Sequence, residues 1–185
     1  MIHYPLPVHR QPAYADLGYG PGSLPATEAA ARENHLEGVV AKRLDTAYLP
    51  GTRSPDWIKV KFDRTGDYVI GGWRAGVRKL GGLLVGVPGP DGRLLFRGRV
   101  GGGIGAAAER ELLSVLAPLA SRDSPFEAGA VPREDARGAH WVRPELVVEV
   151  RYGNRTPDGR LRFPRFLRLR PDKSPDECAE EDEDG

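Results

Sequence analysis

Two lysines that lie two residues apart suggest the clearest chemistry in this sequence. Lys59 and Lys61 belong to the stretch 57–62, and Glu37 precedes them. In a β-strand, residues i and i+2 point to the same face, so the two ammonium groups would lie side by side, with apolar side chains opposite them that can pack into a core. Like charges held this close repel each other, which favours an anion between them. A phosphate fits this position, and the carboxylate of Glu37 could hold its metal ion.

Arginines near the C-terminus form a second group of candidate anion-binding residues. Read as a strand, this segment points Leu167 and Leu169 towards a core and places Phe166, Arg168 and Arg170 on the opposite face. The guanidinium fork suits pyrophosphate or a DNA backbone. Both segments also have a simpler interpretation, since lysines on an edge strand discourage aggregation and a basic strand can merely be solvated.

The charge is distributed unevenly along the chain. The net charge of the 185 residues is +1, but residues 176–185 contain seven acidic residues and no basic one. The first 175 residues therefore carry 27 basic against 19 acidic residues, a net +8. Such an excess suits a polyanionic partner, most commonly nucleic acid. The acidic run itself is predicted to be a solvated, disordered tail.

The composition disfavours several classes of protein. Cys178 is the single cysteine, so neither a disulfide framework nor a cysteine zinc site is possible. The four histidines show no metal-ligand spacing. The N-terminus lacks the apolar run of a signal peptide, and no apolar stretch approaches the length that spans a membrane, so we expect a cytoplasmic protein.

The elements that must position these residues indicate a mainly β fold. Five strand-like stretches follow residue 63: 67–75, 83–87, 93–100, 145–152 and 163–170. A helix predicted at 106–119 separates the third strand from the fourth. Three strands, a helix and two strands is the order of an OB-fold, a five-stranded barrel that often binds nucleic acid. The glycine-rich run 101–105 is interpreted as a flexible turn between strand and helix.

The residues before 64 form a shorter part. Residues 1–22 mix proline, glycine and tyrosine without periodicity. Thr27 is predicted to cap a helix over 28–35, and strands are predicted at 38–43 and 57–62.

Several separated segments resemble motifs of a known family. Segments 37–43, 50–61 and 161–173 resemble the last three nucleotidyltransferase motifs of ATP-dependent DNA ligases, most closely the bacterial ligases of non-homologous end joining. The likeness extends through 140–147 and 156–160. It implies an incomplete C-terminal remnant of the nucleotidyltransferase (adenylation) domain, an OB-fold domain and an acidic tail, with boundaries predicted at 1–63, 64–173 and 174–185.

The resemblance also implies an activity and a set of site residues. In that family a lysine attacks the α-phosphate of ATP, and the resulting AMP passes to the 5′-phosphate of a nick, which the 3′-hydroxyl then seals. By resemblance, Glu37 would help to hold Mg²⁺ or Mn²⁺, while Lys59 and Lys61 would contact the α-phosphate. The motif that orients pyrophosphate is matched by four residues: Arg165, Arg170, Asp172 and Lys173. Charge and position alone predict three DNA-backbone contacts: Arg74, Arg78 and Lys79.

The sequence departs from the family pattern at the nucleophile. The Lys-x-Asp-Gly motif that carries it occurs at none of the five lysines, and 36 residues precede Glu37. We therefore expect the C-terminal part of a ligase, incomplete alone and dependent on an upstream adenylation-domain polypeptide. A stand-alone OB-type DNA-binding module without catalysis is the alternative. An RNA ligase or capping-type nucleotidyltransferase fits the segment 50–61 less well.

Overall fold

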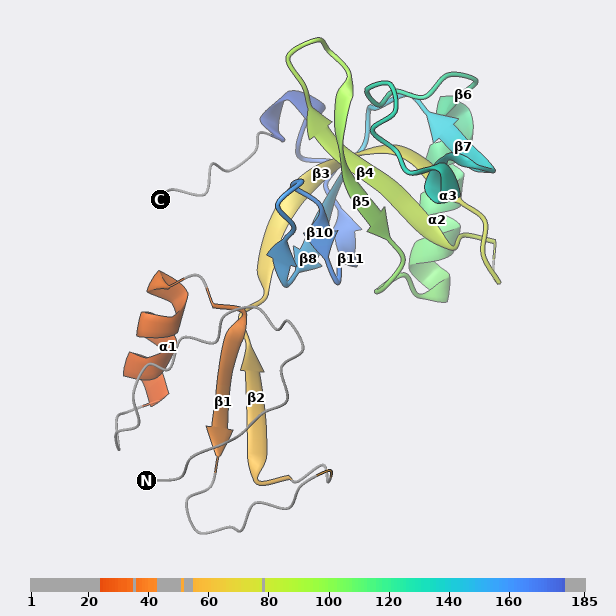
Figure 1. The fold of residues 1–185 in the computed structure, drawn as a ribbon. Coiled ribbons are helices and arrows are strands. Elements are labelled where there is room, and N and C mark those ends of the chain that lie inside the picture. The colour runs from red at the N-terminus through yellow and green to blue at the C-terminus, as the bar shows by residue number, and fades with distance from the viewer. Residues whose placement is uncertain (1–23, 35, 43–50, 52–54, 78, 179–185) are drawn as a thin grey trace. The chain divides into compact units, whose positions relative to one another are not determined.

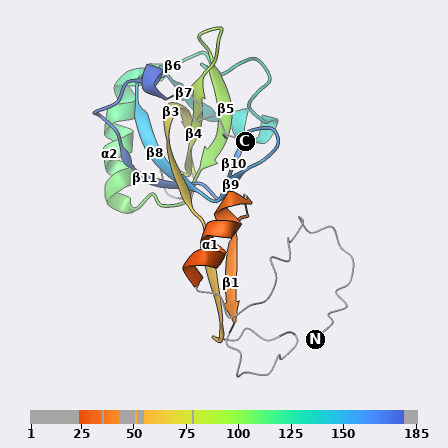
Figure 2. The same cartoon turned by 90° about the vertical axis from the view of Figure 1, so that its left-hand side faces the viewer.

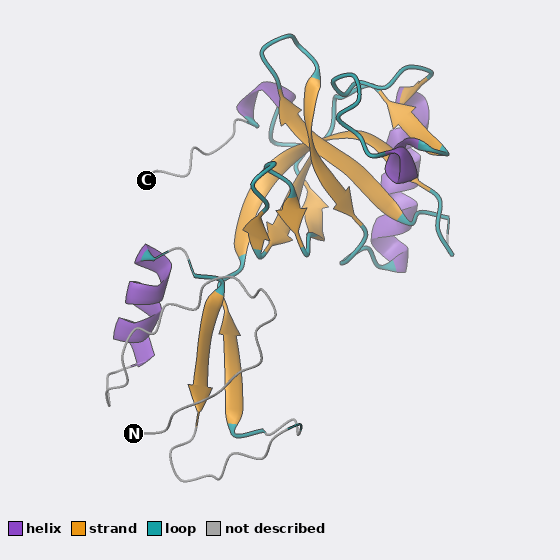
Figure 3. Ribbon diagram, viewed as in Figure 1, coloured by secondary structure: helices purple, strands orange, loops and turns teal. Residues whose placement is uncertain are grey.

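The chain folds as two units, residues 1–62 and 63–185, shown in Figure 1 as a computed structural model. The structure describes residues 24–34, 36–42, 51, 55–77 and 79–178. Strands dominate the second unit (Figure 3). No helix among the described residues is long and apolar enough to cross a lipid bilayer.

The first unit contains one helix and a two-stranded sheet. Its elements are α1 (Leu24–Glu33), β1 (Gly38–Lys42) and β2 (Trp57–Lys61). The two strands are antiparallel, with Gly38 opposite Lys61. The Arg32 guanidinium of α1 lies 4.1 Å from the centre of the buried Phe62 ring, so the helix packs beside the end of β2.

The predicted strands of this unit are confirmed, but the predicted helix start is wrong. Thr27 lies inside α1 and does not cap it, because the helix begins at Leu24. Pro25 occupies the first turn, where its fixed φ angle suits a helix and its missing N–H removes no hydrogen bond. The helix also ends at Glu33, before the predicted residue 35.

The second unit contains most of the strands. In chain order its elements are β3 (Arg64–Arg74), β4 (Gly82–Pro88), β5 (Leu94–Val100), α2 (Ala106–Leu116), η1 (Ala117–Leu119), β6 (Ala120–Ser121), α3 (Arg133–Ala136), β7 (Ala139–Val142), β8 (Val147–Tyr152), β9 (Asn154–Arg155), β10 (Leu161–Arg162), β11 (Arg165–Leu169) and η2 (Pro175–Glu177). All five predicted strands and the helix are present. The structure adds four short strands that the sequence pattern does not predict: β6, β7, β9 and β10.

The five main strands form one sheet whose two ends approach each other. They pair as neighbours in the order β11-β8-β3-β4-β5. The two ends of this path meet just after β5, where Gly102 forms an isolated parallel bridge with Arg165 and its carbonyl oxygen accepts a hydrogen bond of 2.8 Å from the Phe166 N–H. This strand order confirms the predicted OB-fold.

The long strand β3 holds the arrangement together. Its first half pairs with β8, with Arg64 opposite Tyr152, and its second half pairs with β4, with Arg74 opposite Gly82. A register shift between Ile70 and Gly72 marks the change. Such an irregularity bends a strand, which allows one strand to serve two neighbours around a barrel.

The helix α2 covers part of the interior of this unit. It lies at one side of the strands in Figure 2, and Leu112 and Leu116 are fully buried in the main core with Ile70 and Val85. The predicted helix is shorter than expected because η1 begins at Ala117, where the following proline cannot supply a helical N–H.

One predicted side-chain direction in β11 is wrong. Phe166 was expected to face away from the core, but it is only 6% exposed and packs in the main core. The pairing of β11 with β8 shifts between Phe166 and Arg168. This bulge breaks the simple alternation, so Phe166 points inward while Leu169 still packs partly against the core.

The glycine run 101–105 has a steric role at the barrel closure. Gly103 has a φ angle of 84°, and a Cβ at this position would overlap the carbonyl oxygen of Phe166. We expect Gly103→Ala to lower the free energy of unfolding by about 2 kcal/mol, because it adds a clash to a strained φ angle. Gly105→Ala is the matched control, since its Cβ would meet no atom within 4 Å. Denaturant unfolding of both variants measures the difference, and equal losses would contradict the steric role.

Candidate functional site

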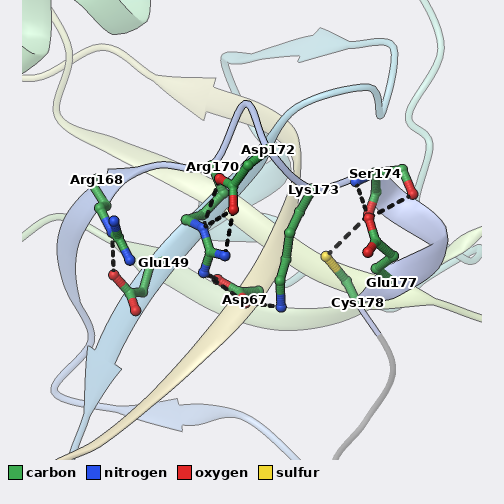
Figure 4. A network of polar contacts seen from close by, with 9 residues as sticks. All are labelled: Asp67, Glu149, Arg168, Arg170, Asp172, Lys173, Ser174, Glu177 and Cys178. Carbon is green, nitrogen blue, oxygen red and sulfur yellow. Dashed lines mark hydrogen bonds and ion pairs between the residues drawn. The ribbon is translucent and has the colours of Figure 1, made fainter.

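The strongest polar cluster of the second unit joins β3 to the residues after β11. Asp67 on β3 receives two of the three cations of the C-terminal motif: Arg170 Nη1 lies 3.0 Å from its Oδ1 and 3.1 Å from its Oδ2, and Lys173 Nζ lies 2.6 Å from its Oδ2. Asp172 is the second acid. Asp67, Arg170, Asp172 and Lys173 are called the Asp67 cluster below (Figure 4).

Asp172 occupies the other edge of the Arg170 guanidinium. Arg170 Nε lies 3.0 Å from Asp172 Oδ1, and Nη2 lies 2.7 Å from Oδ2. The Arg170 side chain is 15% exposed and that of Asp172 is 61% exposed. These hydrogen bonds, with the charge of Asp67, raise the pKa of Arg170, and the hydrogen bond to Asp67 raises the pKa of Lys173. Two acids and two bases therefore share one small surface.

The backbone brings these side chains together. In the sheet Asp67 lies opposite Glu149 of β8, which in turn lies opposite Arg168 of β11. After β11 ends, the Arg170 N–H donates to the Val147 carbonyl oxygen at 2.8 Å. This hydrogen bond holds the turn after β11 close to β8, so that the side chains of the turn reach Asp67 on β3.

The short segment 174–178, which follows the motif, is anchored to the second unit. Ser174 caps η2, where its backbone N–H and its hydroxyl both hydrogen bond to Glu177, and Cys178 is 1% exposed in the second core cluster with Val69 and Val147. The predicted disordered tail from residue 174 is thus wrong for 174–178, because the thiol at the end of this segment is a buried apolar anchor. Residues 179–185 lie outside the described residues.

The Arg170 pair gives a testable pH dependence. The hydrogen bond from Arg170 lowers the pKa of Asp172 from its ordinary 3.8 to about 2. Because the folded state binds this proton more weakly than the unfolded state, the stabilising contribution of Asp172 is complete above about pH 4 and is lost as the pH falls towards 2. A carboxyl-detected NMR titration should show a midpoint near 2, and Arg170→Gln should move it towards 3.8. A midpoint near 3.8 in the unaltered chain would contradict the pairing.

The candidate α-phosphate residues lie in the first unit. Lys59 and Lys61 lie on β2 and are exposed, and Glu37, also exposed, accepts a backbone hydrogen bond of 3.0 Å from the Phe62 N–H. The strand alternation therefore brings both lysines to one face, with Lys61 near Glu37 in the sheet. The opposite face packs only in part: Phe62 is buried, as expected, but Ile58 is 61% exposed.

The remaining predicted residues lie elsewhere. Arg165 begins β11, opposite Arg151 of β8, at the far end of the strand from Arg170. Arg74 ends β3 and is half-buried, whereas Lys79 is exposed in the connection to β4. Arg78 lies outside the described residues. The structure thus joins three of the four motif residues in the Asp67 cluster, and Arg165 stands apart from them.

Sequence reasoning missed two residues of this unit. Asp67 gave one signal, because aspartate is disfavoured in strands and here it precedes an apolar run. Phe163 is 69% exposed at a φ angle of 54°. It lies 5.7 Å from the Arg162 guanidinium, measured to the ring centre. An exposed aromatic ring in a disfavoured conformation beside an arginine is typical of a functional surface.

Comparison with known proteins identifies related sequences. A family model described as the ATP dependent DNA ligase C terminal region matches residues 76–173. The multifunctional non-homologous end joining protein LigD of Mycolicibacterium smegmatis is 50% identical over 163 residues, which cover 86% of this chain and 21% of LigD. DNA ligase C1 of the same organism is 38% identical over 157 residues, covering 78% of this chain and 43% of that protein.

Solved structures agree with this result. The ligase domain of M. tuberculosis LigD matches with a TM-score of 0.63 and 47% identity, covering 87% of this chain and 53% of that domain. A mycobacterial DNA ligase D complexed with ATP and MES matches with a TM-score of 0.59 and 47% identity, covering 86% of this chain and 52% of that one. The chain therefore spans about a fifth of the length of LigD and about half of its ligase domain.

Proposed function

Because the chain belongs to the family of the ATP-dependent DNA ligase C-terminal region, we propose that it works as the OB-fold part of a ligase that seals DNA through lysyl-AMP and DNA-adenylate intermediates. The observation that carries the proposal is the family match over 76–173, a segment that includes the motif cations Arg170 and Lys173. A relative at 47% identity forms a complex with ATP. The activity would be cytoplasmic, where ATP and DNA are both available.

Each candidate residue receives a role in this proposal. Lys59 and Lys61 contact the α-phosphate of ATP and neutralise the charge that shifts as AMP is transferred. The four motif residues orient the pyrophosphate that leaves: Arg165, Arg170, Asp172 and Lys173. Arg165 lies at the other end of β11 from the Asp67 cluster, so it approaches the pyrophosphate from a separate position.

The DNA-binding role rests on charge and position. Three cations would contact phosphates of the DNA backbone: Arg74, Arg78 and Lys79. The exposed ring of Phe163 and the neighbouring Arg162 offer a further contact, because aromatic and cationic side chains together bind nucleic acid. The net charge of +8 over the first 175 residues supports a polyanionic partner.

The metal ion needs ligands beyond those described. Among the residues that the structure describes, no group of three or more histidine, cysteine, aspartate or glutamate side chains could hold a metal ion. Glu37 alone does not make a site for Mg²⁺ or Mn²⁺, which prefer several oxygen ligands. In our proposal Glu37 supplies one of them.

Catalysis also needs a lysine nucleophile. No Lys-x-Asp-Gly motif occurs in this sequence. The attacking amine, which displaces pyrophosphate from the α-phosphorus of ATP, must therefore come from an adenylation-domain polypeptide outside these residues.

Incubation with α-labelled ATP and Mg²⁺ tests the proposal. We expect no label on the chain alone. Addition of a ligase polypeptide that carries the Lys-x-Asp-Gly motif should place label on that polypeptide and restore sealing of a nicked duplex. Label that stays on this chain after denaturation would contradict the requirement for an external nucleophile. Salt-dependent DNA binding without any restored sealing would favour the alternative, a DNA-binding module without catalysis.

A further inference from the structure

Two cations of the C-terminal motif, Arg170 and Lys173, already hold an anion of the protein itself. Both oxygens of Asp67 lie within 3.1 Å of Arg170 Nη1, and one of them lies 2.6 Å from Lys173 Nζ. The Asp67 side chain is only 14% exposed. A carboxylate that receives two cations from one side occupies the position that two oxygens of a phosphate group would take.

The charges of the cluster balance each other. Asp67 and Asp172 carry two negative charges against the two positive charges of Arg170 and Lys173. A pyrophosphate that approaches these cations therefore meets no net positive charge. The cations attract the pyrophosphate only when one of the two carboxylates no longer pairs with them.

The geometry distinguishes the two carboxylates. Asp172 lies two residues from Arg170 and accepts hydrogen bonds from both its Nε and its Nη2, so the two side chains can move together. Asp67 is fixed in the strand β3, and its carboxylate accepts hydrogen bonds from Arg170 Nη1 and from the flexible Lys173 side chain. We propose that Asp67 is an internal counter-anion, which pyrophosphate displaces from Arg170 and Lys173 when these residues engage the nucleotide. This inference rests on the proposed pyrophosphate role of the two cations.

Binding of inorganic pyrophosphate to the full chain tests the inference. Asp67→Asn removes the charge but keeps a side chain of the same shape with an acceptor oxygen. We expect it to bind pyrophosphate about tenfold more tightly than the unaltered chain, because no carboxylate competes for the cations. The measurement is isothermal titration calorimetry at constant ionic strength.

Glu149→Gln is the matched control. Glu149 lies opposite Asp67 in the sheet and pairs with Arg168 at 2.7 Å, so the variant makes the same change in charge and also frees an arginine. We expect it to change the affinity by no more than about twofold, because this pair lies outside the Asp67 cluster. Asp67→Ser provides a second test of the same charge removal if Asp67→Asn unfolds, which thermal unfolding would reveal.

The outcomes separate the two proposals. If Asp67→Asn binds pyrophosphate no more tightly than Glu149→Gln, or more weakly than the unaltered chain, Asp67 is not a competing anion and the inference is wrong. If Arg170→Gln and Lys173→Gln leave binding unchanged in the unaltered chain and in Asp67→Asn, the pyrophosphate role of these cations fails, and the inference fails with it.

Discussion

Replacing Lys59 with alanine is expected to lower the rate of adenylation by about 100-fold or more in a ligase restored with a nucleophile-bearing polypeptide. The proposed role of this ammonium is to neutralise charge on the α-phosphate as pyrophosphate leaves. An interaction of this kind is stronger in the transition state than in the ground state, so its loss lowers the rate more than the affinity for ATP. Single-turnover transfer of labelled AMP at saturating ATP measures the effect.

Lys79→Ala is the comparison for this variant. Lys79 is exposed in the connection between β3 and β4, and its proposed partner is a DNA phosphate. Its loss should weaken nick binding and reduce the dependence on salt, while adenylation without DNA changes by less than about twofold. Equal loss of adenylation in the two variants would contradict the α-phosphate role of Lys59.

Arg170→Ala is expected to separate two steps of the reaction. In the restored ligase it should lower the rate of adenylation by about 100-fold, because pyrophosphate loses the cation that orients it as it leaves. Sealing of a nick that already carries AMP involves no pyrophosphate and should fall by less than about tenfold. Measuring both rates in the same preparation tests the role.

Arg168→Ala controls for the general loss of an arginine. Arg168 is exposed at the end of β11 and pairs with Glu149 across the sheet. Its removal should change neither step by more than a few fold, because an exposed ion pair contributes little. If Arg170→Ala slowed both steps equally, or if Arg168→Ala had the same effect, the motif would have a structural role and not a role in the first step.

The positions of the barrel strands along the chain could be predicted because the apolar pattern of each strand is contained in its own segment. The strands β3, β4, β5, β8 and β11 each form a run of residues suited to a sheet, and the leucines of α2 repeat at helical spacing. The direction of Phe166 could not be predicted, because the bulge depends on how β11 pairs with β8. The short strand β7 likewise forms only where β3 offers it a free edge, and β6 then pairs with β7.

The candidate site divides in the same way. The motif cations Arg170 and Lys173 could be identified because both lie in one short segment of the sequence. Their partner Asp67 precedes them by 103 and 106 positions, so only the folded sheet brings it to them. Cys178 gave no signal either, since its burial depends on the surface formed by several strands.

The buried position of Cys178 makes the chain its own reporter of local opening. It is the single thiol, it ends the segment that follows Lys173, and burial raises its pKa to about 11. An alkylating reagent at neutral pH therefore reacts only when this segment lifts from the strands beneath it. The alkylation rate then measures how often the segment that follows the motif opens.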